Sequence, residues 1–476
     1  MQNAASLGEA VPGWSPRPLP PDEAIEGRYT RLEPLDSARH GDDLFAAQVG
    51  DTDRLWTYRF QGPFPDRAPF DAYLGDIANG ADARFFAYID KSTGKAGGLG
   101  SFMSMVPAMG SIEIGAIMIG SLMQRTREGT EALMLMARWA FAAGYRRLEW
   151  TCDPHNDASM KAAERLGFSF EAEFRGAYVT KGRNRDKSIW AIIDGDWPAI
   201  DAAYDAWLAK DNFEGGRQKS ALSTLTAPLV HARSAVKPGE AKDTLGQPIG
   251  AAVADWTPPP WPPREPIEGR YCRVEPLDAN NHAEALFEAN RQDDDIWNYL
   301  PYGPFNTLDA YREWIAAEAL GDDPLFHAIV DKATGKPAGV ASYLRIAPSA
   351  GSIEAGHINY AKPLQRTRAG TEAMYFLMKR AFELGYRRYE WKCNALNAGS
   401  RSLAMRLGLS FEGVFRQAAV IKGRNRDTAW YGAIDAEWPV LQTAFETWLA
   451  PSNFDADGRQ RTRLSDLTAP VLVARG

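Results

Sequence analysis

The chain has 476 residues, a length typical of two or three domains. Hydrophobic residues make up 45% and charged residues 24%, ordinary globular values that exclude a disordered or fibrous chain. The formal net charge of −7 argues against a dedicated nucleic-acid binder, which usually carries a basic excess, so we expect no nucleic-acid partner. Three cysteines cannot form a disulfide framework and no CxxC pair offers a zinc site, so we expect no metal and a reducing environment.

Neither a membrane segment nor a targeting segment is evident. The longest apolar stretches fall far short of the roughly 18 residues that span a bilayer. Residues 1–4 show neither the basic n-region nor the apolar h-region of a signal peptide. We therefore expect a cytoplasmic protein with no membrane partner.

The sequence contains two copies of one module. The motif Glu26-Gly27-Arg28-Tyr29 recurs at 268–271, and Leu225-Thr226-Ala227-Pro228 recurs at 467–470, both at an offset of 242 residues (26 to 268). Between them Gly62-Pro63-Phe64 recurs at 303–305, so one residue is missing from a loop of the second copy. A period this long indicates a duplicated domain. It predicts an N-terminal domain over 1–233, a linker over 234–255 and a C-terminal domain over 256–476, with Pro-rich entry segments that wrap onto each domain.

Strands and helices mix within each copy. Residues 84–89, 98–106 and 111–119 have strand patterns. A helix follows over 130–141 and ends near Gly144, then a strand over 147–152 and a short helix over 158–166 that ends at Gly167. Two strands meet in a hairpin at 181–186, whose charges we expect to be solvated, and a helix covers 197–208. This order predicts an α/β (α+β) fold with a mixed sheet.

A polar motif lies between a strand and a helix. Residues 124–132 (QRTREGTEA) are matched by 365–373 (QRTRAGTEA). Thr126 is a suitable N-cap, and the free N–H groups, the helix dipole and two arginines suit a phosphate. An ordinary capped helix with solvated arginines explains the same residues.

A second motif pairs Asn156 with Ser159, and Asn397 with Ser400 in the second copy. Asn is a natural N-cap and glycine ends each short helix, so capping alone accounts for the pattern.

The third candidate is a pair of carboxylates on neighbouring strands. Strand alternation puts Glu113 on the face opposite Ile112 and Ile114, and its counterpart is Glu354. Glu149 and Glu390 are placed in the same way. A strand carboxylate that faces a cleft can act as a general base, whereas a glutamate paired with one of the many arginines is the structural alternative.

Taken together, these motifs resemble the GNAT superfamily of acetyl-CoA-dependent N-acetyltransferases, and within it the RimJ/RimL-like ribosomal-protein alanine and serine acetyltransferases. The resemblance rests on the 365–373 motif, residues 390–393 (EWKC), Asn397 with Ser400, and residues 406–408 (RLG), and it recurs in both copies. It implies two tandem domains, each with a mixed, splayed central sheet flanked by helices, which pack on each other as a pseudo-dimer.

The resemblance also implies an acyltransferase that uses acetyl-CoA and a primary amine, either a protein N-terminal α-amine or a small molecule, in a ternary complex. Ser159 and Ser400 would protonate the departing thiolate, with Glu113 and Glu354 as bases and a backbone N–H near Gly115 or Gly356 polarising the thioester. The implied acetyl-CoA contacts are Gln124, Arg125, Thr126, Arg127, Glu128, Gly129, Thr130 and Asn156, and Gln365, Arg366, Thr367, Arg368, Ala369, Gly370, Thr371 and Asn397.

The phosphate loop departs from the family pattern. Two glycines are usual where this chain has Arg125 and Arg127, or Arg366 and Arg368. These side chains restrict close backbone approach but add the positive charge that phosphates attract. A CoA-binding sensor or scaffold, with one or both domains catalytically silent, is the alternative function.

Overall fold

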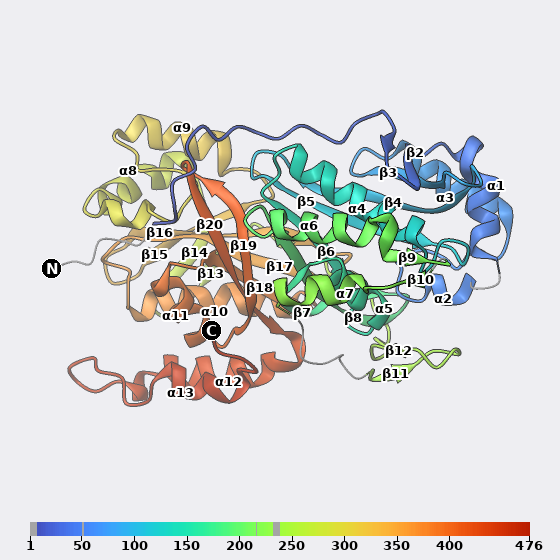
Figure 1. The fold of residues 1–476 in the computed structure, drawn as a ribbon. Coiled ribbons are helices and arrows are strands. Elements are labelled where there is room, and N and C mark those ends of the chain that lie inside the picture. Colours follow the sequence, from blue (N-terminus) through green and yellow to red (C-terminus); the bar gives the residue numbers. More distant parts are fainter. Residues whose placement is uncertain (1–6, 50–51, 216, 232–238) are drawn as a thin grey trace.

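The computed structural model describes residues 7–49, 52–215, 217–231 and 239–476. Figure 1 shows the two repeats side by side, the first in blue and green and the second in yellow to red. Within these ranges, none of the helices combines the length and apolar character that crossing a bilayer requires.

The N-terminal repeat alternates strands and helices much as the sequence predicts. Its strands are β1 (Ile25–Glu26), β2 (Thr30–Pro34), β3 (Arg84–Asp90), β4 (Ala96–Val106), β5 (Ser111–Ile119), β6 (Arg147–Cys152), β7 (Ser169–Thr180), β8 (Arg183–Ile193), β9 (Phe213–Glu214) and β10 (Arg217–Gln218). Its helices are α1 (Ser37–Gln48), α2 (Thr52–Trp56), α3 (Arg67–Asn79), α4 (Arg127–Ala142), α5 (Asp157–Arg165), α6 (Trp197–Leu208) and α7 (Leu222–Thr226).

The C-terminal repeat has the same main elements in the same order, with a 3-10 helix (Asp294–Trp297) in place of α2 and an isolated bridge between Phe454 and Gln460 in place of β9 and β10. After a small hairpin, β11 (Ala241–Lys242) and β12 (Pro248–Ile249), its strands are β13 (Ile267–Glu268), β14 (Cys272–Pro276), β15 (Leu325–Asp331), β16 (Lys336–Ala347), β17 (Ser352–Tyr360), β18 (Arg388–Asn394), β19 (Ser410–Ile421) and β20 (Arg424–Ile434). Its helices are α8 (Ala279–Asn290), α9 (Leu308–Glu318), α10 (Arg368–Glu383), α11 (Ala398–Arg406), α12 (Trp438–Leu449) and α13 (Leu464–Thr468).

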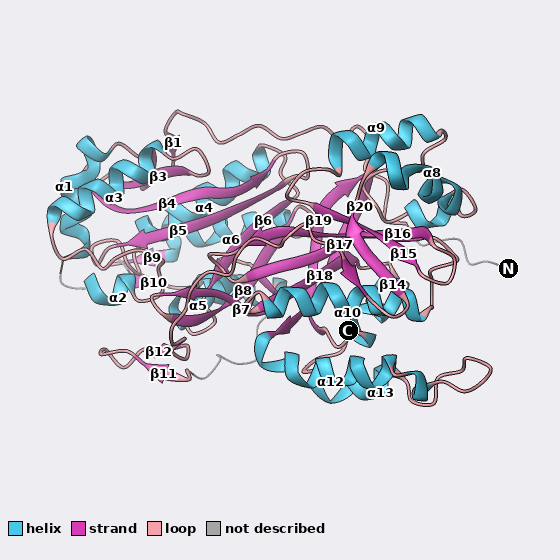
Figure 2. Cartoon of the chain, turned by 180° about the vertical axis from the view of Figure 1, so that it is seen from behind, coloured by secondary structure: helices cyan, strands magenta, loops and turns pink. Residues whose placement is uncertain are grey.

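One sheet runs through both repeats. Its order is β1-β2-β3-β4-β5-β6-β8-β7-β19-β20-β18-β17-β16-β15-β14-β13, sixteen strands in the part of the chain that the structure describes. Figure 2 shows these strands in magenta with helices packed against the sheet. Among the described strands of this sheet, only β5 with β6 and β17 with β18 are parallel pairs, which confirms the mixed α/β sheet that the sequence predicts.

Each parallel pair separates partway along its length. The register of β17 and β18 ends at Ala355 and Trp391, although β17 continues to Tyr360 and β18 to Asn394. The N-terminal pair separates in the same way after Glu113 and Glu149. Past that point the backbone groups of the two strands no longer satisfy each other, which leaves an opening in the middle of each repeat.

The repeats meet along β7 and β19, around a pseudo-two-fold axis. The register pairs Gly413 with Ala172, which are equivalent positions of the two copies. A Cβ on Gly413 would lie 2.1 Å from the Glu171 carbonyl oxygen, so a glycine is needed for this approach. Phe174 stacks on its own counterpart, Phe415, with ring centroids 5.7 Å apart. The contact is therefore isologous, as in a symmetric homodimer.

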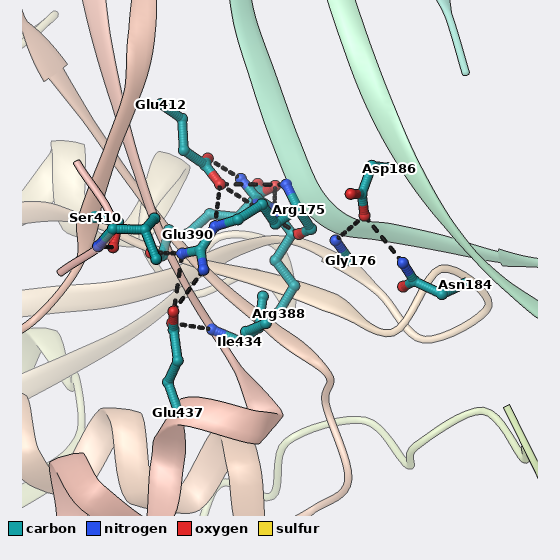
Figure 3. A network of polar contacts seen from close by, with 12 residues as sticks. Arg175, Gly176, Asn184, Asp186, Arg388, Glu390, Ser410, Glu412, Ile434 and Glu437 are labelled. Atoms are coloured by element: carbon teal, nitrogen blue, oxygen red, sulfur yellow. Dashed lines mark hydrogen bonds and ion pairs between the residues drawn. The ribbon is translucent and has the colours of Figure 1, made fainter. Parts of the chain in front are cut away.

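Two fully buried arginines, Arg388 and Arg147, lie beside this contact, and Figure 3 shows the polar contacts around Arg388. Arg388 donates to Glu390 at 2.7 Å and to Glu412 at 2.6 Å within its own repeat, and to the Arg175 carbonyl of the other repeat at 2.8 Å. Its counterpart Arg147 donates to the Arg416 carbonyl at 2.8 Å. Each guanidinium is thus neutralised by its own repeat and also hydrogen-bonded to the other, as buried charges require.

The entry segments are exchanged between the repeats. The Val11 N–H donates to the Gly423 carbonyl and Glu9 accepts from the Asn425 N–H, both at 2.8 Å. In the same way Val253 and Ala251 pair with the turn between β7 and β8. Figure 1 shows the dark-blue entry segment crossing from the C-terminal repeat to the N-terminal one.

Each Pro-rich segment then wraps onto its own repeat, as expected. The Tyr145 hydroxyl donates to the Pro18 carbonyl at 2.8 Å, and the Tyr386 hydroxyl to the Pro260 carbonyl at 3.2 Å. The sequence did not reveal that the residues before these segments pair with the β-hairpin of the other repeat.

The predicted linker is partly structured. Residues 234–238 lie outside the described part of the chain, whereas the β11–β12 hairpin packs on the N-terminal repeat. The Thr57 hydroxyl donates to Asp243 at 3.1 Å, and the Tyr58 hydroxyl donates to the Pro248 carbonyl at 2.9 Å.

The expectation of solvated charges at 181–186 is wrong for Asp186, which is buried and accepts from the Gly176 N–H at 2.8 Å.

Removing one buried arginine tests the inter-repeat network. We expect Arg388→Met to lower the free energy of unfolding by about 3–5 kcal/mol, because Glu390 and Glu412 lose their counter-charge in a buried site. Urea unfolding followed by tryptophan fluorescence measures the change. The control is Arg291→Met, which breaks an exposed pair with Glu288 and costs at most about 1 kcal/mol. Equal losses in the two variants would contradict this account.

A buried histidine makes the C-terminal repeat sensitive to acid. His327 is fully buried against Tyr343, and burial, with Arg380 nearby, lowers its pKa to about 3. The unfolded chain binds a proton below about pH 6.5 whereas the folded state does not, so stability is lost as the pH falls from about 6.5 towards 3.

The first repeat supplies the matched variant, because Phe86 occupies the position of His327 and packs on Phe102 as His327 does on Tyr343. We expect His327→Phe to gain stability over the parent as the pH falls, on the order of 4 kcal/mol by pH 3. Unfolding curves between pH 7 and 4 check the trend. Parallel pH profiles for the two proteins would show that His327 titrates normally.

Candidate active site

The opening between β17 and β18 leads into a cleft of about 1150 Å³. Trp391 contributes to the apolar core under α10, so strand alternation turns Glu390 and Lys392 to the other face of the sheet. The cleft therefore lies on the α10–α11 face. Its walls include predicted contact residues from the start of α10 and α11, namely Gln365, Arg366, Thr367, Arg368, Gly370, Thr371, Asn397 and Ser400.

The loop before α10 is held by its threonine cap. Thr367 Oγ1 accepts from the Gly370 N–H at 3.0 Å and donates to the Leu364 carbonyl at 2.7 Å. Arg366 has a φ of 60°, the left-handed conformation that favours glycine. A Cβ on Gly370 would lie 2.8 Å from the Leu364 carbonyl oxygen, so this glycine keeps the loop closed against the helix.

The other loop residues have mainly structural contacts. Gln365 Nε2 donates to the Tyr360 carbonyl at 2.7 Å, which ties the loop to the end of β17. The Arg368 guanidinium lies over the rings of Tyr271 and Phe454, 4.9 and 4.5 Å from their centroids. Ala369 is buried in the first turn of α10 and does not line the cleft.

The N-terminal repeat reproduces this loop. Thr126 Oγ1 accepts from the Gly129 N–H at 3.1 Å, and Arg125 has a φ of 59°. Arg127 stacks on Tyr29 at 3.5 Å and pairs with Glu128 at 3.1 Å. The Gln124 and Thr130 side chains are hydrogen-bonded to the Ile119 and Thr126 carbonyls, respectively.

Ser400 is oriented by a tryptophan. Trp391 Nε1 donates to Ser400 Oγ at 3.0 Å, and the Ser400 N–H donates to Asn397 Oδ1 at 3.0 Å. The same pair of bonds holds Ser159, from Trp150 at 3.1 Å and to Asn156 at 3.1 Å. The serine oxygen accepts the tryptophan hydrogen bond, and Ser400 is also hydrogen-bonded to the Cys393 side chain. The asparagines act as caps, as the structural interpretation predicts, and each keeps its Nδ2 group for other contacts.

The strand carboxylates lie at the start of each opening, and both are buried. Glu113 accepts from the Thr151 hydroxyl at 2.6 Å and from the Ser104 hydroxyl at 2.8 Å. Its counterpart Glu354 is ion-paired with Arg345. The two sites therefore hold the same carboxylate in different ways: Glu113 accepts from two neutral donors with Lys187 nearby, whereas Glu354 pairs directly with a cation.

The neighbouring carboxylates follow the structural alternative. Glu149 and Glu390 accept from the buried arginines Arg147 and Arg388 at 2.8 and 2.7 Å. They belong to the ion network of the inter-repeat contact.

Two features of the site were not predicted. Arg406 lines the cleft, lies 4.9 Å over the Trp448 ring and donates to Thr371 at 3.2 Å. Its counterpart Arg165 is in the same Arg-Leu-Gly motif. The repetition of this motif is the sequence signal that could have identified the arginine. The second feature is a bulge directly after Gly115 and Gly356, where Ala116 and His357 have φ of 50° and 49°.

Among the described residues, no group of three or more His, Cys, Asp or Glu side chains is placed to hold a metal ion.

Comparison with known proteins identifies the domain. A family model described as "Acetyltransferase (GNAT) domain" matches residues 30–169 and again 273–410, which together are more than half of the chain. No curated protein matches.

Several solved structures are similar to a part of this chain that is less than half of its length. A GCN5-related N-acetyltransferase from Brucella melitensis is 45% identical over 45% of this chain and 99% of its own, with a TM-score of 0.44. A probable GNAT-family acetyltransferase from Chromobacterium violaceum is 38% identical over 42% and 100%, with a TM-score of 0.40. RimL, a ribosomal L7/L12 alpha-N-protein acetyltransferase, is 20% identical over 38% and 99%, with a TM-score of 0.32.

The two matches of the family model confirm the resemblance found in the sequence motifs and the duplication found in the repeat. The chain belongs to the GNAT acetyltransferase family, with one copy of the domain in each half, and it is an acyltransferase.

Proposed function

We propose that each domain transfers the acetyl group of acetyl-CoA to a primary amine by direct attack in a ternary complex. The observation that carries this proposal is the opening between β17 and β18. Ser400 lies on its cleft side and Glu354 is turned to the opposite face. An acyl donor in the cleft and an amine on the other face would meet in the opening, which suits a single displacement without a covalent enzyme intermediate.

The cleft residues fit the cofactor. Free N–H groups at the capped start of α10, together with Arg366 and Arg406, form a positive site for the pyrophosphate. Asn397 would contact the pantetheine arm, and the left-handed bulge after Gly356 exposes backbone N–H groups for the thioester oxygen. Acetyl-CoA supplies the activated acyl group, and no metal takes part in this proposal.

Proton transfer decides which amines react. At pH 7 a lysine-like amine costs about 4–5 kcal/mol to deprotonate, whereas an N-terminal α-amine costs about 1–1.4 kcal/mol. A buried glutamate, Glu113 or Glu354, acting directly or through water, could therefore serve an α-amine as base. This favours protein N-termini and α-amino small molecules as acceptors.

We also propose that the domains, over 1–233 and 256–476, form a cytoplasmic pseudo-dimer without nucleic acid as a partner. The exchanged entry segments and the isologous β7–β19 contact support this arrangement.

The alternative is a CoA-binding sensor or scaffold. Calorimetric titration with acetyl-CoA, followed by a panel of amines monitored for free CoA thiol, separates the two functions. Acetyl transfer requires thiol release that depends on the amine. Two binding events without thiol release would favour the sensor, and no binding would exclude both.

The serines can be tested one domain at a time. We expect Ser159→Ala and Ser400→Ala each to lower kcat of their own domain about 10²-fold, because a positioned general acid contributes on this scale. The affinity for acetyl-CoA should change little, since the serine acts on the departing thiolate. Steady-state thiol release and calorimetry measure the two quantities.

The double variant Ser159→Ala/Ser400→Ala should lose nearly all activity, and Ser465→Ala, on the exposed surface of α13, should lose none. Our expectation is that the C-terminal domain is the more active, so that Ser400→Ala causes the larger loss in the full chain. Equal losses would exclude this asymmetry, and full activity in the double variant would exclude the role of both serines.

A further inference from the structure

The two domains differ most on the face of the sheet opposite the cleft, where the amine would bind. Lys392 and Trp430 are direct cross-strand partners on β18 and β20, and Arg426 lies on the same face of β20. The N-terminal counterparts of Lys392 and Trp430 are Thr151 and Ile189.

We propose that the C-terminal domain acetylates an amine that also carries a carboxylate, and that Arg426, Lys392 and Trp430 bind this carboxylate. The inference rests on the proposed function and names the acceptor class of the same site.

Two buried N–H donors on this face, Arg426 Nε and Trp430 Nε1, make no hydrogen bond within the described part of the chain. The Lys392 side-chain nitrogen lies 5.5 Å from the centroid of the Trp430 ring. Buried donors without partners are costly, so a ligand that is rich in acceptor atoms would satisfy them.

The net charge of this face of the sheet indicates the charge of the ligand. Arg345 neutralises Glu354, and Arg388 neutralises Glu390, so these pairs add no net charge. Arg426 is the cation left over, because no ion pair to it occurs among the described residues. One uncompensated charge matches a carboxylate better than a doubly charged phosphate.

In the N-terminal domain, the corresponding arginine has a carboxylate beside it. There Arg185 occupies the position of Arg426 and has Asp153 at 3.9 Å. The C-terminal domain has the uncharged Asn394 in place of Asp153. The second copy thus keeps the arginine and lacks its carboxylate, which leaves the acid to be supplied by a ligand.

The aromatic ring that covers the arginine is also missing from the second copy. In the N-terminal domain Phe60 and Tyr178 pack edge to face at 5.4 Å, and Arg185 lies 4.3 Å over the Phe60 ring. Their counterparts are the smaller Pro301 and Ala419. Arg426 therefore lacks the counterparts of both the carboxylate and the aromatic ring that contact Arg185.

Two bases on this face have lowered pKa values, chiefly because they are buried. Burial, with nearby Arg345 and Arg426, holds the pKa of Lys392 well below its usual range and lowers that of His357 to about 4. The titratable and charged groups that face them are Arg345 on β16, Glu354 on β17, Glu390 on β18, Arg426 on β20, and Tyr302 of the loop before α9. A bound carboxylate would favour the charged forms, so binding should take up protons.

The acid group should lie close to the amine. Lys392 is two residues beyond Glu390, which pairs with Glu354, and this spacing is about 7 Å along a strand. Both a free amino acid and a peptide with an acidic first residue place a carboxylate within this reach.

The test uses the full chain with Ser159→Ala, so that the C-terminal site is measured. Substrates are compared in matched pairs: glycine with glycinamide, and a tripeptide amide that begins with Asp with one that begins with Asn. We expect the carboxylate member of at least one pair to have a kcat/KM at least 10-fold higher, mainly through KM. The pair that discriminates identifies the source, a free amino acid or a peptide N-terminus.

The key variant is Asn394→Asp. It introduces the carboxylate that the first domain has at Asp153, and it changes the shape of the side chain little. We expect it to remove the preference while the amide substrates react as before, and Arg426→Gln to act in the same direction. Calorimetry of the preferred acid in two buffers of different ionisation enthalpy should show proton uptake that Asn394→Asp abolishes.

The outcomes are distinguishable. If Ser159→Ala protein acetylates both members of each pair equally, the carboxylate inference is wrong and the acetyltransferase function stands. If it acetylates no amine of the panel, the proposed function of the C-terminal domain is wrong. A preference that survives in Asn394→Asp would move the carboxylate site away from Arg426 and overturn the inference.

Discussion

The divergence of one parallel strand pair in each repeat is the constraint on which the rest of the site depends. As long as β17 and β18 stay hydrogen-bonded, the sheet is a closed wall between the α10–α11 face and the opposite face. Their separation after Ala355 and Trp391 lets groups on the two faces reach one point. The bulge at His357, the capped start of α10 and the tryptophan-held Ser400 are all placed around that opening. Chemistry at the opening can thus combine a cofactor from one side with an acceptor from the other.

The contact between the repeats reaches the sites through the same strands. Arg388 and Glu390 lie on β18, one of the two strands that diverge, and Arg388 is hydrogen-bonded across the pseudo-two-fold axis. A domain removed from its partner would leave this guanidinium without its carbonyl acceptor beside the opening. Duplication within one chain keeps the two copies at equal amounts and frees them to differ in sequence. The replacement of Asp153 by Asn394, and of Thr151 by Lys392, shows how far the acceptor faces have diverged while the cofactor loops stayed alike.

Much of this could be predicted from the sequence. The strand over 111–119 and the helix over 197–208 have the predicted bounds, because alternation and flanking caps are local signals. The Thr126 and Asn156 caps were also predictable, since capping depends on neighbouring residues. The pairing of β7 with β19, the exchange of the entry segments and the partners of Glu354 were not, because they depend on residues far apart in the chain. Arg406 was missed although its motif is repeated, since nothing local distinguishes a cleft arginine from a solvated one.

The exchanged entry segments have a consequence for synthesis of the chain. Residues 9–11 complete a strand edge at 423–425, which the ribosome makes more than 400 residues later. The hairpin of the first repeat in turn waits for residues 251–253, so the first repeat reaches its final form only after the second has begun. Until then the hairpin of the first repeat presents an unpaired edge, the kind of surface that recruits other strands. A fragment that ends between the repeats would keep that edge permanently open, so the two copies, although alike in fold, mature as one unit.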